Sequence, residues 1–316
     1  MNSAIAFLFP GQGSQAIGMG KELADCYPVA RETFAEADGA LGYSLSQLCF
    51  AGPEDKLKLT EITQPAILTV SIAAERVLAQ HGIKPAFVAG HSLGEYSAHV
   101  AARTLSFADA VRTVAKRGRY MQEAVPVGVG AMAAVLALGL EPIEEACRQA
   151  QQETGGTVSA ANINSPDQIV ISGSKAAVER AAELTKERGA KRAVMLPVSA
   201  PFHCALMRPA QDRLAEDLRA LTFSLPGIPV VTNVDAKLIS EAEQARDALI
   251  RQVTGAVQWV RSIQELIAAG VQTFVEVGPG KVLTGLLRQI DRSKTGLNVE
   301  NEESLQKMLA AEKRFR

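Results

Sequence analysis

Short apolar runs alternate along the chain with longer segments in which apolar residues recur every three or four positions. Residues 4–9 and 86–89 are continuous apolar runs and predict buried strands. Residues 21–40 and 63–81 have the longer period and predict helices. Strands that alternate with helices in this way are typical of a mostly parallel sheet covered by helices.

The pattern changes in the middle of the chain. Six segments there predict, in order, strand, helix, strand, strand, helix and strand: 131–138, 142–153, 158–162, 168–172, 175–188 and 193–198. This order is that of a ferredoxin-like unit. We therefore expect a small α+β domain over 127–199, inserted into a larger domain made of residues 1–126 and 200–316.

After this small domain, the pattern of the larger sheet returns. Apolar runs at 228–233 and 273–277 predict further strands, and 281–290 predicts a helix that follows Gly278-Pro279-Gly280. The charged tail over 302–316 has the pattern of an amphipathic helix or a frayed end, and its default interpretation is a solvated terminus.

Composition narrows the possible classes of function. The chain has 316 residues, of which 47% are hydrophobic and 21% are charged, and a formal net charge of −1. Such a balance gives no overall field for nucleic acid or an anionic membrane, and no apolar stretch approaches the length of a membrane span. The four cysteines lie apart without a Cys-x-x-Cys pair, so we expect reduced thiols, no metal site and a cytoplasmic protein.

The segment Gly90-His91-Ser92-Leu93-Gly94 lies between a predicted strand and a predicted helix. This setting is typical of a nucleophile elbow, a sharp turn that lifts a serine Oγ out of the sheet, and it predicts an α/β-hydrolase-like large domain. The backbone N–H of Leu93 would lie at a helix N-terminus, where it can bind an oxyanion. In contrast, Gly11-Gln12-Gly13 lacks the remaining residues of a nucleotide-binding loop.

A serine nucleophile needs a general base, and the chain has four histidines. His81, His91 and His99 have settings that favour structural roles. His203 follows a predicted strand in a loop, where a side chain can reach a cleft, so we expect His203 to be the base. No carboxylate stands out as a third member of a triad, because Asp235 could equally cap a turn.

Six signatures occur in order between the N-terminus and about residue 290: 9–15 (Phe-Pro-Gly-Gln-Gly-Ser-Gln), 90–95 (Gly-His-Ser-Leu-Gly-Glu), Arg117-Gly118 with Met121-Gln122, Asn162 with 164–166 (Asn-Ser-Pro), 199–203 (Ser-Ala-Pro-Phe-His), and 276–280 (Glu-Val-Gly-Pro-Gly). Together they resemble the malonyl-CoA:acyl carrier protein transacylases. The resemblance implies an acyltransferase that moves malonyl from coenzyme A to a serine, and from there to the phosphopantetheine thiol of acyl carrier protein. It implies no cofactor beyond the phosphopantetheine that the partner carries.

The resemblance also assigns roles to residues. It implies Ser92 as nucleophile and His203 as base, with an oxyanion hole from the backbone N–H groups of Gln12 and Leu93. Arg117 matches the family's clamp for the malonyl carboxylate, a task that suits the planar guanidinium fork. The remaining positions implied are substrate contacts at Met121, Asn162 and Phe202, a carbonyl at Gln258 that orients the base, and basic docking residues Lys191, Arg192 and Arg288.

Two other classes of function stay open at this point. A serine esterase or thioesterase shares the elbow, but such enzymes place their histidine late in the chain, whereas more than a hundred residues follow His203. A carrier-protein docking subunit without catalysis would have no reason to retain Ser92, His203, Gln12 and Arg117. Fatty-acid and polyketide pathways are not distinguished by the sequence, and we expect a monomer.

Overall fold

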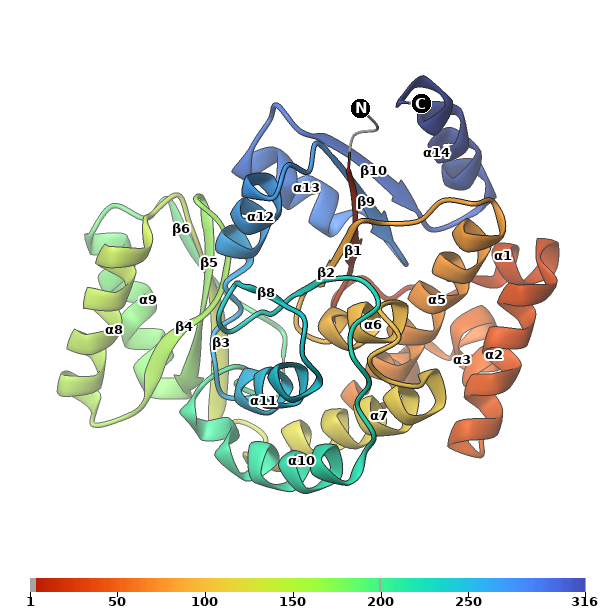
Figure 1. Ribbon diagram of the computed structural model, residues 1–316. Coiled ribbons are helices and arrows are strands. Elements are labelled where there is room, and N and C mark those ends of the chain that lie inside the picture. Colours follow the sequence, from red (N-terminus) through yellow and green to blue (C-terminus); the bar gives the residue numbers. More distant parts are fainter. Residues whose placement is uncertain (1–3, 199, 316) are drawn as a thin grey trace.

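Two sheets organise the chain in the computed structural model, which describes residues 4–198 and 200–315 (Figure 1). The larger sheet has the order β10-β9-β1-β2-β7-β8. Its central strands are β1 (Ile5–Phe9), β2 (Phe87–Gly90) and β9 (Thr273–Val277), and its outer strands are β7 (Val230–Val231), β8 (Leu238–Ile239) and β10 (Thr295–Val299). All neighbours pair in parallel except β7 with β8, so the predicted mostly parallel sheet is confirmed.

Helices cover both faces of this sheet because alternate side chains of its strands point in opposite directions. Phe7 and Phe9 of β1 join a large core with α2 (Pro28–Leu41), α5 (Thr60–Gln80) and α7 (Phe107–Glu123). Ala6 and Leu8 face α12 (Trp259–Ala268) and α13 (Val282–Ile290) on the other side. Further helices of this domain are α1 (Lys21–Cys26), α3 (Leu45–Ala51), α4 (Glu54–Leu57), α6 (Gly94–Ala101), α10 (Arg208–Ala220) with the preceding 3-10 turn (Ala205–Met207), and α11 (Ala242–Gln252).

The small domain is ferredoxin-like, as predicted. Its elements are β3 (Gly130–Leu136), α8 (Leu140–Thr154), β4 (Val158–Ser165), β5 (Gln168–Ser174), α9 (Lys175–Glu187) and β6 (Arg192–Met195). The four strands form an antiparallel sheet in the order β4-β5-β3-β6, with its own apolar core under α8 and α9. All six elements fall between residues 127 and 199. Figure 1 shows this domain beside the larger sheet.

A short bridge joins the two sheets. Asn162 of β4 pairs in parallel with Val257, and the next residue, Gln258, donates its backbone N–H to the Asn233 carbonyl oxygen at 2.9 Å. Asn233 follows β7, so the edge of the small sheet is held close to the carboxyl ends of the large sheet's strands. Ligand sites of open α/β sheets lie at the carboxyl ends of the strands.

Three expectations from the sequence differ from the structure. The helix predicted over 21–40 is two helices, because Pro28 starts α2 and cannot continue the hydrogen bonding of α1. Residues 196–198, predicted as strand, lie beyond β6. The run 228–233 forms only the two-residue strand β7.

The C-terminal part of the chain also departs from its default interpretation. Strand β10, which sequence analysis missed, extends the large sheet at its edge. The helix α14 (Glu302–Phe315) packs against β10 and α1 with Leu305 and Met308 fully buried. The tail is therefore part of the packed domain and not a solvated terminus. Among the helices described here, none combines the length and apolarity needed to cross a bilayer.

Candidate active site

Ser92 lies in a strained turn between β2 and α6. Its φ is 52°, in the left-handed region that non-glycine residues rarely adopt. The flanking glycines permit the turn, because a Cβ on Gly90 would lie 1.9 Å from the Gly94 carbonyl and one on Gly94 would lie 2.0 Å from the Phe9 carbonyl oxygen. The predicted elbow thus has the expected strand-turn-helix geometry.

His203 reaches Ser92 from a separate loop between β6 and α10. Its Nε2 lies 2.7 Å from Ser92 Oγ, and its Nδ1 lies 2.9 Å from the Gln252 carbonyl oxygen. Because a carbonyl can only accept, Nδ1 carries the proton and Nε2 is left to accept the Ser92 hydroxyl proton. The structure therefore brings together the nucleophile and base that the sequence predicted.

The carbonyl that orients His203 belongs to Gln252, and the prediction of Gln258 was wrong. Gln252 is the last residue of α11, where a helix leaves its carbonyl oxygens without internal partners. Gln258 instead precedes α12, and its carbonyl oxygen accepts the first backbone hydrogen bond of that helix, from Ser262 at 2.9 Å. The orienting carbonyl thus lies six residues before the expected position.

Burial lowers the pKa of His203 to about 3, and the nearby Arg117 guanidinium lowers it further. The imidazole is then neutral, as a general base must be, across the neutral range. We expect imidazole NMR resonances of His203 to show no titration between pH 5 and 8. A midpoint near the ordinary histidine value of about 6.5 would contradict this.

Arg117 is buried beside the dyad, with 1% of its surface exposed. Its Nη2 lies 3.2 Å from Ser92 Oγ and 2.9 Å from Gln252 Oε1, and its Nη1 donates to Gln64 Oε1 at 2.8 Å. Burial lowers the pKa of this guanidinium, but arginine stays cationic in proteins. A fixed positive charge therefore lies within hydrogen-bond distance of the Ser92 hydroxyl.

Sequence reasoning missed the neutral side chains that hold these groups. Gln64 and Gln252 carry no charge and belong to ordinary helical patterns, so neither gave a signal. Asn233 Oδ1 accepts the Ser92 backbone N–H and Asn233 Nδ2 donates to the Gly90 carbonyl oxygen, both at 2.7 Å. Asn233 thus clamps both sides of the elbow from the end of β7.

The residues of the predicted oxyanion donors, Gln12 and Leu93, line one pocket together with Ser92. Leu93 directly precedes α6, and Gln12 lies in the loop after β1. Gly11 allows that loop to approach the elbow, because a Cβ there would lie 2.5 Å from the His91 carbonyl oxygen. Across residues 4–198 and 200–315, no hydrogen bond takes up the backbone N–H of Gln12 or Leu93.

A pocket of about 590 Å³ opens in front of Ser92. Eight of the residues that the sequence singled out line it: Gln12, Ser92, Leu93, Arg117, Met121, Asn162, Phe202 and His203. Its walls come from both domains, since Met132 of β3 and Leu286 of α13 also line it. Asn162 Oδ1 is buried and has no hydrogen-bond partner among the described residues.

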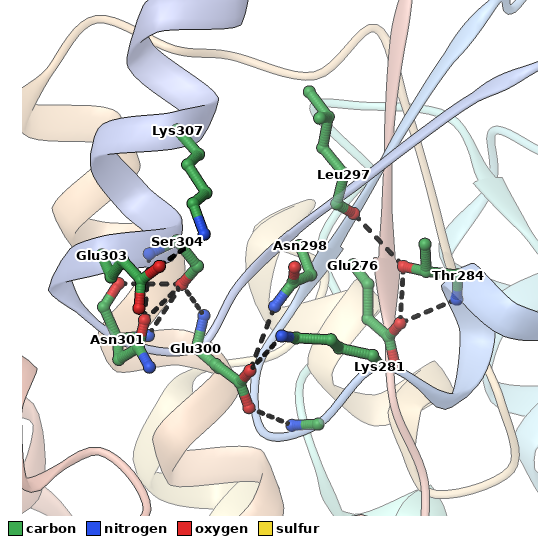
Figure 2. A network of polar contacts seen from close by, with 11 residues as sticks. Glu276, Lys281, Thr284, Leu297, Asn298, Glu300, Asn301, Glu303, Ser304 and Lys307 are labelled. Carbon is green, nitrogen blue, oxygen red and sulfur yellow. Dashed lines mark hydrogen bonds and ion pairs between the residues drawn. The ribbon is translucent and has the colours of Figure 1, made fainter.

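Two carboxylates, the buried Glu276 and the partly buried Glu300, belong to a network of polar contacts around the start of α13 (Figure 2). Glu276 at the end of β9 accepts the backbone N–H groups of Leu283 and Thr284 at 3.0 and 2.8 Å, which satisfies donors in the first turn of α13. Glu300 Oε2 accepts the Gly280 N–H at 2.9 Å. These contacts hold the loop before α13 and the first turn of that helix. Val282 and Leu283 of this turn line the pocket in front of Ser92.

The other predicted residues lie outside the pocket. Lys191, Arg192 and Arg288 are exposed, the first two at the start of β6 and the third on α13. Asp235 pairs with Arg251 through two contacts of 3.0 and 2.6 Å and is not a partner of His203. Ser199 of the fifth signature lies outside the described residues.

The other histidines have structural settings, as expected. His91 Nε2 lies 2.7 Å from Asn164 Oδ1 of β4, which ties the elbow to the small domain. His99 is fully buried within α6, and His81 ends α5. In the ranges that the structure describes, no three side chains of the metal-binding types gather into a site.

An elbow serine held against an imidazole, with a buried cation beside it, is an arrangement that suits acyl-group chemistry. A family model described as acyl transferase domain matches residues 6–313. The chain belongs to this acyl transferase family.

Relatives within the family are close. The chain is 55% identical over 286 residues to the malonyl CoA-acyl carrier protein transacylase of Escherichia coli K12, covering 90% of this chain and 92% of that protein. A crystal structure of an acyl carrier protein S-malonyltransferase from Vibrio cholerae has 50% identity and a TM-score of 0.95, covering 97% of this chain and all of that one. The malonyl-transacylase PlMCAT, solved with the type II PKS acyl-carrier protein AntF, has 47% identity and the same TM-score, covering 98% and 100%.

Proposed function

We propose that this enzyme transfers malonyl from malonyl-CoA to the phosphopantetheine thiol of acyl carrier protein through a malonyl ester on Ser92. The observation that carries the proposal is the buried Arg117 at 3.2 Å from Ser92 Oγ, which itself lies 2.7 Å from His203 Nε2. An esterase that acts on an uncharged acyl group needs no such cation beside its serine. A cation fixed beside the nucleophile suits an acyl group that ends in a carboxylate.

The first half-reaction loads the serine. His203 Nε2 takes the hydroxyl proton as Ser92 Oγ attacks the thioester carbonyl carbon, and the carbonyl oxygen becomes an oxyanion. The backbone N–H groups of Gln12 and Leu93 stabilise that charge, a contribution worth on the order of 10²-fold in rate for one donor. The tetrahedral intermediate then expels the coenzyme A sulfur, which receives the proton from the His203 imidazolium.

The second half-reaction reverses these roles with a new thiol. His203 removes the proton of the phosphopantetheine thiol, whose sulfur attacks the ester carbonyl on Ser92. Collapse of the second intermediate breaks the bond to Ser92 Oγ, and His203 returns the proton to this oxygen. The enzyme is thereby regenerated by a ping-pong route.

Arg117 is held in a position where it can bind the free carboxylate of the malonyl group. A guanidinium carries five N–H groups, and Gln64 and Gln252 each hold one terminal nitrogen in place. One N–H on each terminal nitrogen remains for a ligand once the Ser92 oxygen has become an ester. Phe202 and Met121 line the same pocket and would crowd a substituent on the malonyl α-carbon, a discrimination limited to about 1 to 3 kcal/mol for one methyl group.

The carrier protein would dock at the pocket mouth. Arg192 lies on β6, just before the pocket-lining segment 196–198, and Arg288 lies on α13, which supplies Leu283 and Leu286 to the pocket. With Lys191, these exposed cations suit an acidic partner. We further propose a cytoplasmic monomer that supplies fatty-acid or polyketide synthesis, since one chain provides every group of the site and the four cysteines are free thiols.

Intact-mass spectrometry after mixing with malonyl-CoA tests this proposal. We expect a malonyl adduct that persists until holo acyl carrier protein is added and then moves to that protein. Rapid release of free malonate would instead identify a hydrolase. The absence of any adduct would identify a binding subunit.

Substituting Arg117→Ala should lower malonyl transfer on the order of 100-fold, because charge-assisted contacts to the carboxylate are worth roughly 1.5–3 kcal/mol. Activity with acetyl-CoA, which has no far carboxylate, should rise relative to malonyl-CoA. Acylation rates with the two substrates give this ratio. Arg119→Ala is the matched control, since Arg119 lies on the same helix but is exposed and pairs with Glu61. An unchanged ratio in Arg117→Ala would remove the clamp from the mechanism.

A further inference from the structure

Glu95 is a fully buried carboxylate behind the active site. It lies in the first turn of α6, three residues after Ser92, with none of its surface exposed. Its Oε2 accepts the Asn233 backbone N–H at 3.1 Å and the Gln252 side-chain Nε2 at 2.7 Å. A buried carboxylate costs free energy unless it is well satisfied, and the steps proposed above do not use it.

The side chain of Gln252 connects Glu95 to the carboxylate clamp. Gln252 Nε2 donates to Glu95 Oε2 and to the Ser92 carbonyl oxygen, the latter at 2.9 Å. At the other end of the same amide, Oε1 accepts from Arg117 Nη2 at 2.9 Å. The chain of contacts therefore runs from Glu95 through one amide to the guanidinium that faces Ser92 Oγ.

These contacts permit only one orientation of the amide. Arginine can only donate, so the group facing Arg117 must be the amide oxygen. The Ser92 carbonyl and Glu95 Oε2 accept, so the group facing them must be the NH2. A flipped amide would set donor against donor at Arg117 and acceptor against acceptor at Glu95. Glu95 thus stabilises the orientation that presents an acceptor to Arg117.

We propose that Glu95 is a positioning residue that fixes the Gln252 amide and, through it, holds Arg117 where a malonyl carboxylate binds. The inference rests on the function proposed above. Gln252 orients His203 through its backbone carbonyl, which belongs to α11 and does not depend on the side-chain amide. Disturbing Glu95 should therefore affect the carboxylate clamp more than the dyad.

The position of the Glu95 oxygen matters more than its charge. Burial raises the pKa of Glu95 to about 7, so a proton is readily held near neutral pH. Glu95 Oε1 has no hydrogen-bond partner among the described residues and lies 4.0 Å from His99 Nε2. A proton on Oε1 leaves Oε2 an acceptor, so Gln252 is fixed in either state.

Two conservative substitutions of Glu95 separate the effect of the oxygen's position from the effect of the carboxylate's charge. Glu95→Gln removes the charge but can place an amide oxygen where Oε2 lies, because the donors from Asn233 and Gln252 require an acceptor there. Glu95→Asp keeps the carboxylate but withdraws it by one methylene from Gln252. Ser97→Ala is the matched control, a buried polar residue of the same helix whose Oγ has no partner among the described residues.

The measurement is kcat/KM for acylation by malonyl-CoA and by acetyl-CoA. We expect Glu95→Asp to lower the value for malonyl-CoA on the order of 10-fold, as for a lost hydrogen bond to a charged network, and to change that for acetyl-CoA by less than about 3-fold. Glu95→Gln and Ser97→Ala should leave the ratio of the two values close to that of the unsubstituted enzyme.

The opposite pattern, loss in Glu95→Gln with Glu95→Asp unaffected, would overturn the proposal in favour of charge compensation. An equal fall for both substrates in Glu95→Asp would also overturn it and indicate a purely structural role. Failure of the proposed function is distinguishable from these results, because it appears in the unsubstituted enzyme as the absence of a malonyl adduct on Ser92.

Discussion

Ser92→Ala should form no malonyl adduct, and transfer to acyl carrier protein should fall roughly 10⁶-fold, the scale on which serine enzymes lose activity with their nucleophile. The physical reason is that no other hydroxyl lies at the elbow, with His203 Nε2 at 2.7 Å to take its proton. The pocket and Arg117 remain, so the variant should still bind malonyl-CoA. Intact-mass spectrometry after mixing with malonyl-CoA measures the adduct directly.

Ser97→Ala serves again as the control, because it removes a buried hydroxyl from the helix that follows the elbow without touching the dyad. This control should acylate at the rate of the unsubstituted enzyme. A malonyl adduct that persists in Ser92→Ala would mean that another residue is the nucleophile, and peptide mapping would identify it.

His203→Ala should slow acylation on the order of 10⁴-fold, the upper range for loss of a general base. The Ser92 hydroxyl is a weak nucleophile at neutral pH, and no other base lies within hydrogen-bond reach of it among the described residues. The residual rate should rise with pH, because hydroxide then replaces the missing imidazole. Time-resolved intact-mass measurements of the adduct give the rate.

The matched control for this change is His81→Ala, since His81 is exposed at the end of α5, where its ring packs against Tyr27. That variant should acylate normally. If His203→Ala also acylates at a near-normal rate, the base must be assigned to another group.

Local signals explain why the catalytic pair could be predicted. The elbow is a short motif whose glycines and flanking pattern all lie within ten residues of Ser92. His203 could be predicted from its place in a loop after a predicted strand, and because the other three histidines lie at the elbow or on helices. The large sheet and the small domain were predictable for a similar reason, because both rest on periodic runs of apolar residues.

The groups that hold the pair could not be predicted, because they meet only in three dimensions. Gln64, Asn233 and Gln252 come from three distant elements and carry no charge that would single them out. The error over Gln258 has the same origin. Which carbonyl is free to face His203 depends on where α11 ends and α12 begins, and helix boundaries are the least certain part of a prediction from sequence.

The C-terminal segment illustrates a different limit. Strand β10 is partly exposed along most of its length and has a weak apolar pattern, so it gave no clear signal. Once it pairs with β9, the following helix can bury Leu305 and Met308. A charged amphipathic tail therefore folds because of a strand that the pattern did not reveal.

The most direct test of the account is a crystal structure of the enzyme trapped after reaction with malonyl-CoA. It should show an ester on Ser92 Oγ, with its carbonyl oxygen at the backbone N–H groups of Gln12 and Leu93 and its free carboxylate paired with both terminal nitrogens of Arg117. A malonyl group whose carboxylate points to solvent, with Arg117 still bound only to its glutamines, would contradict the account.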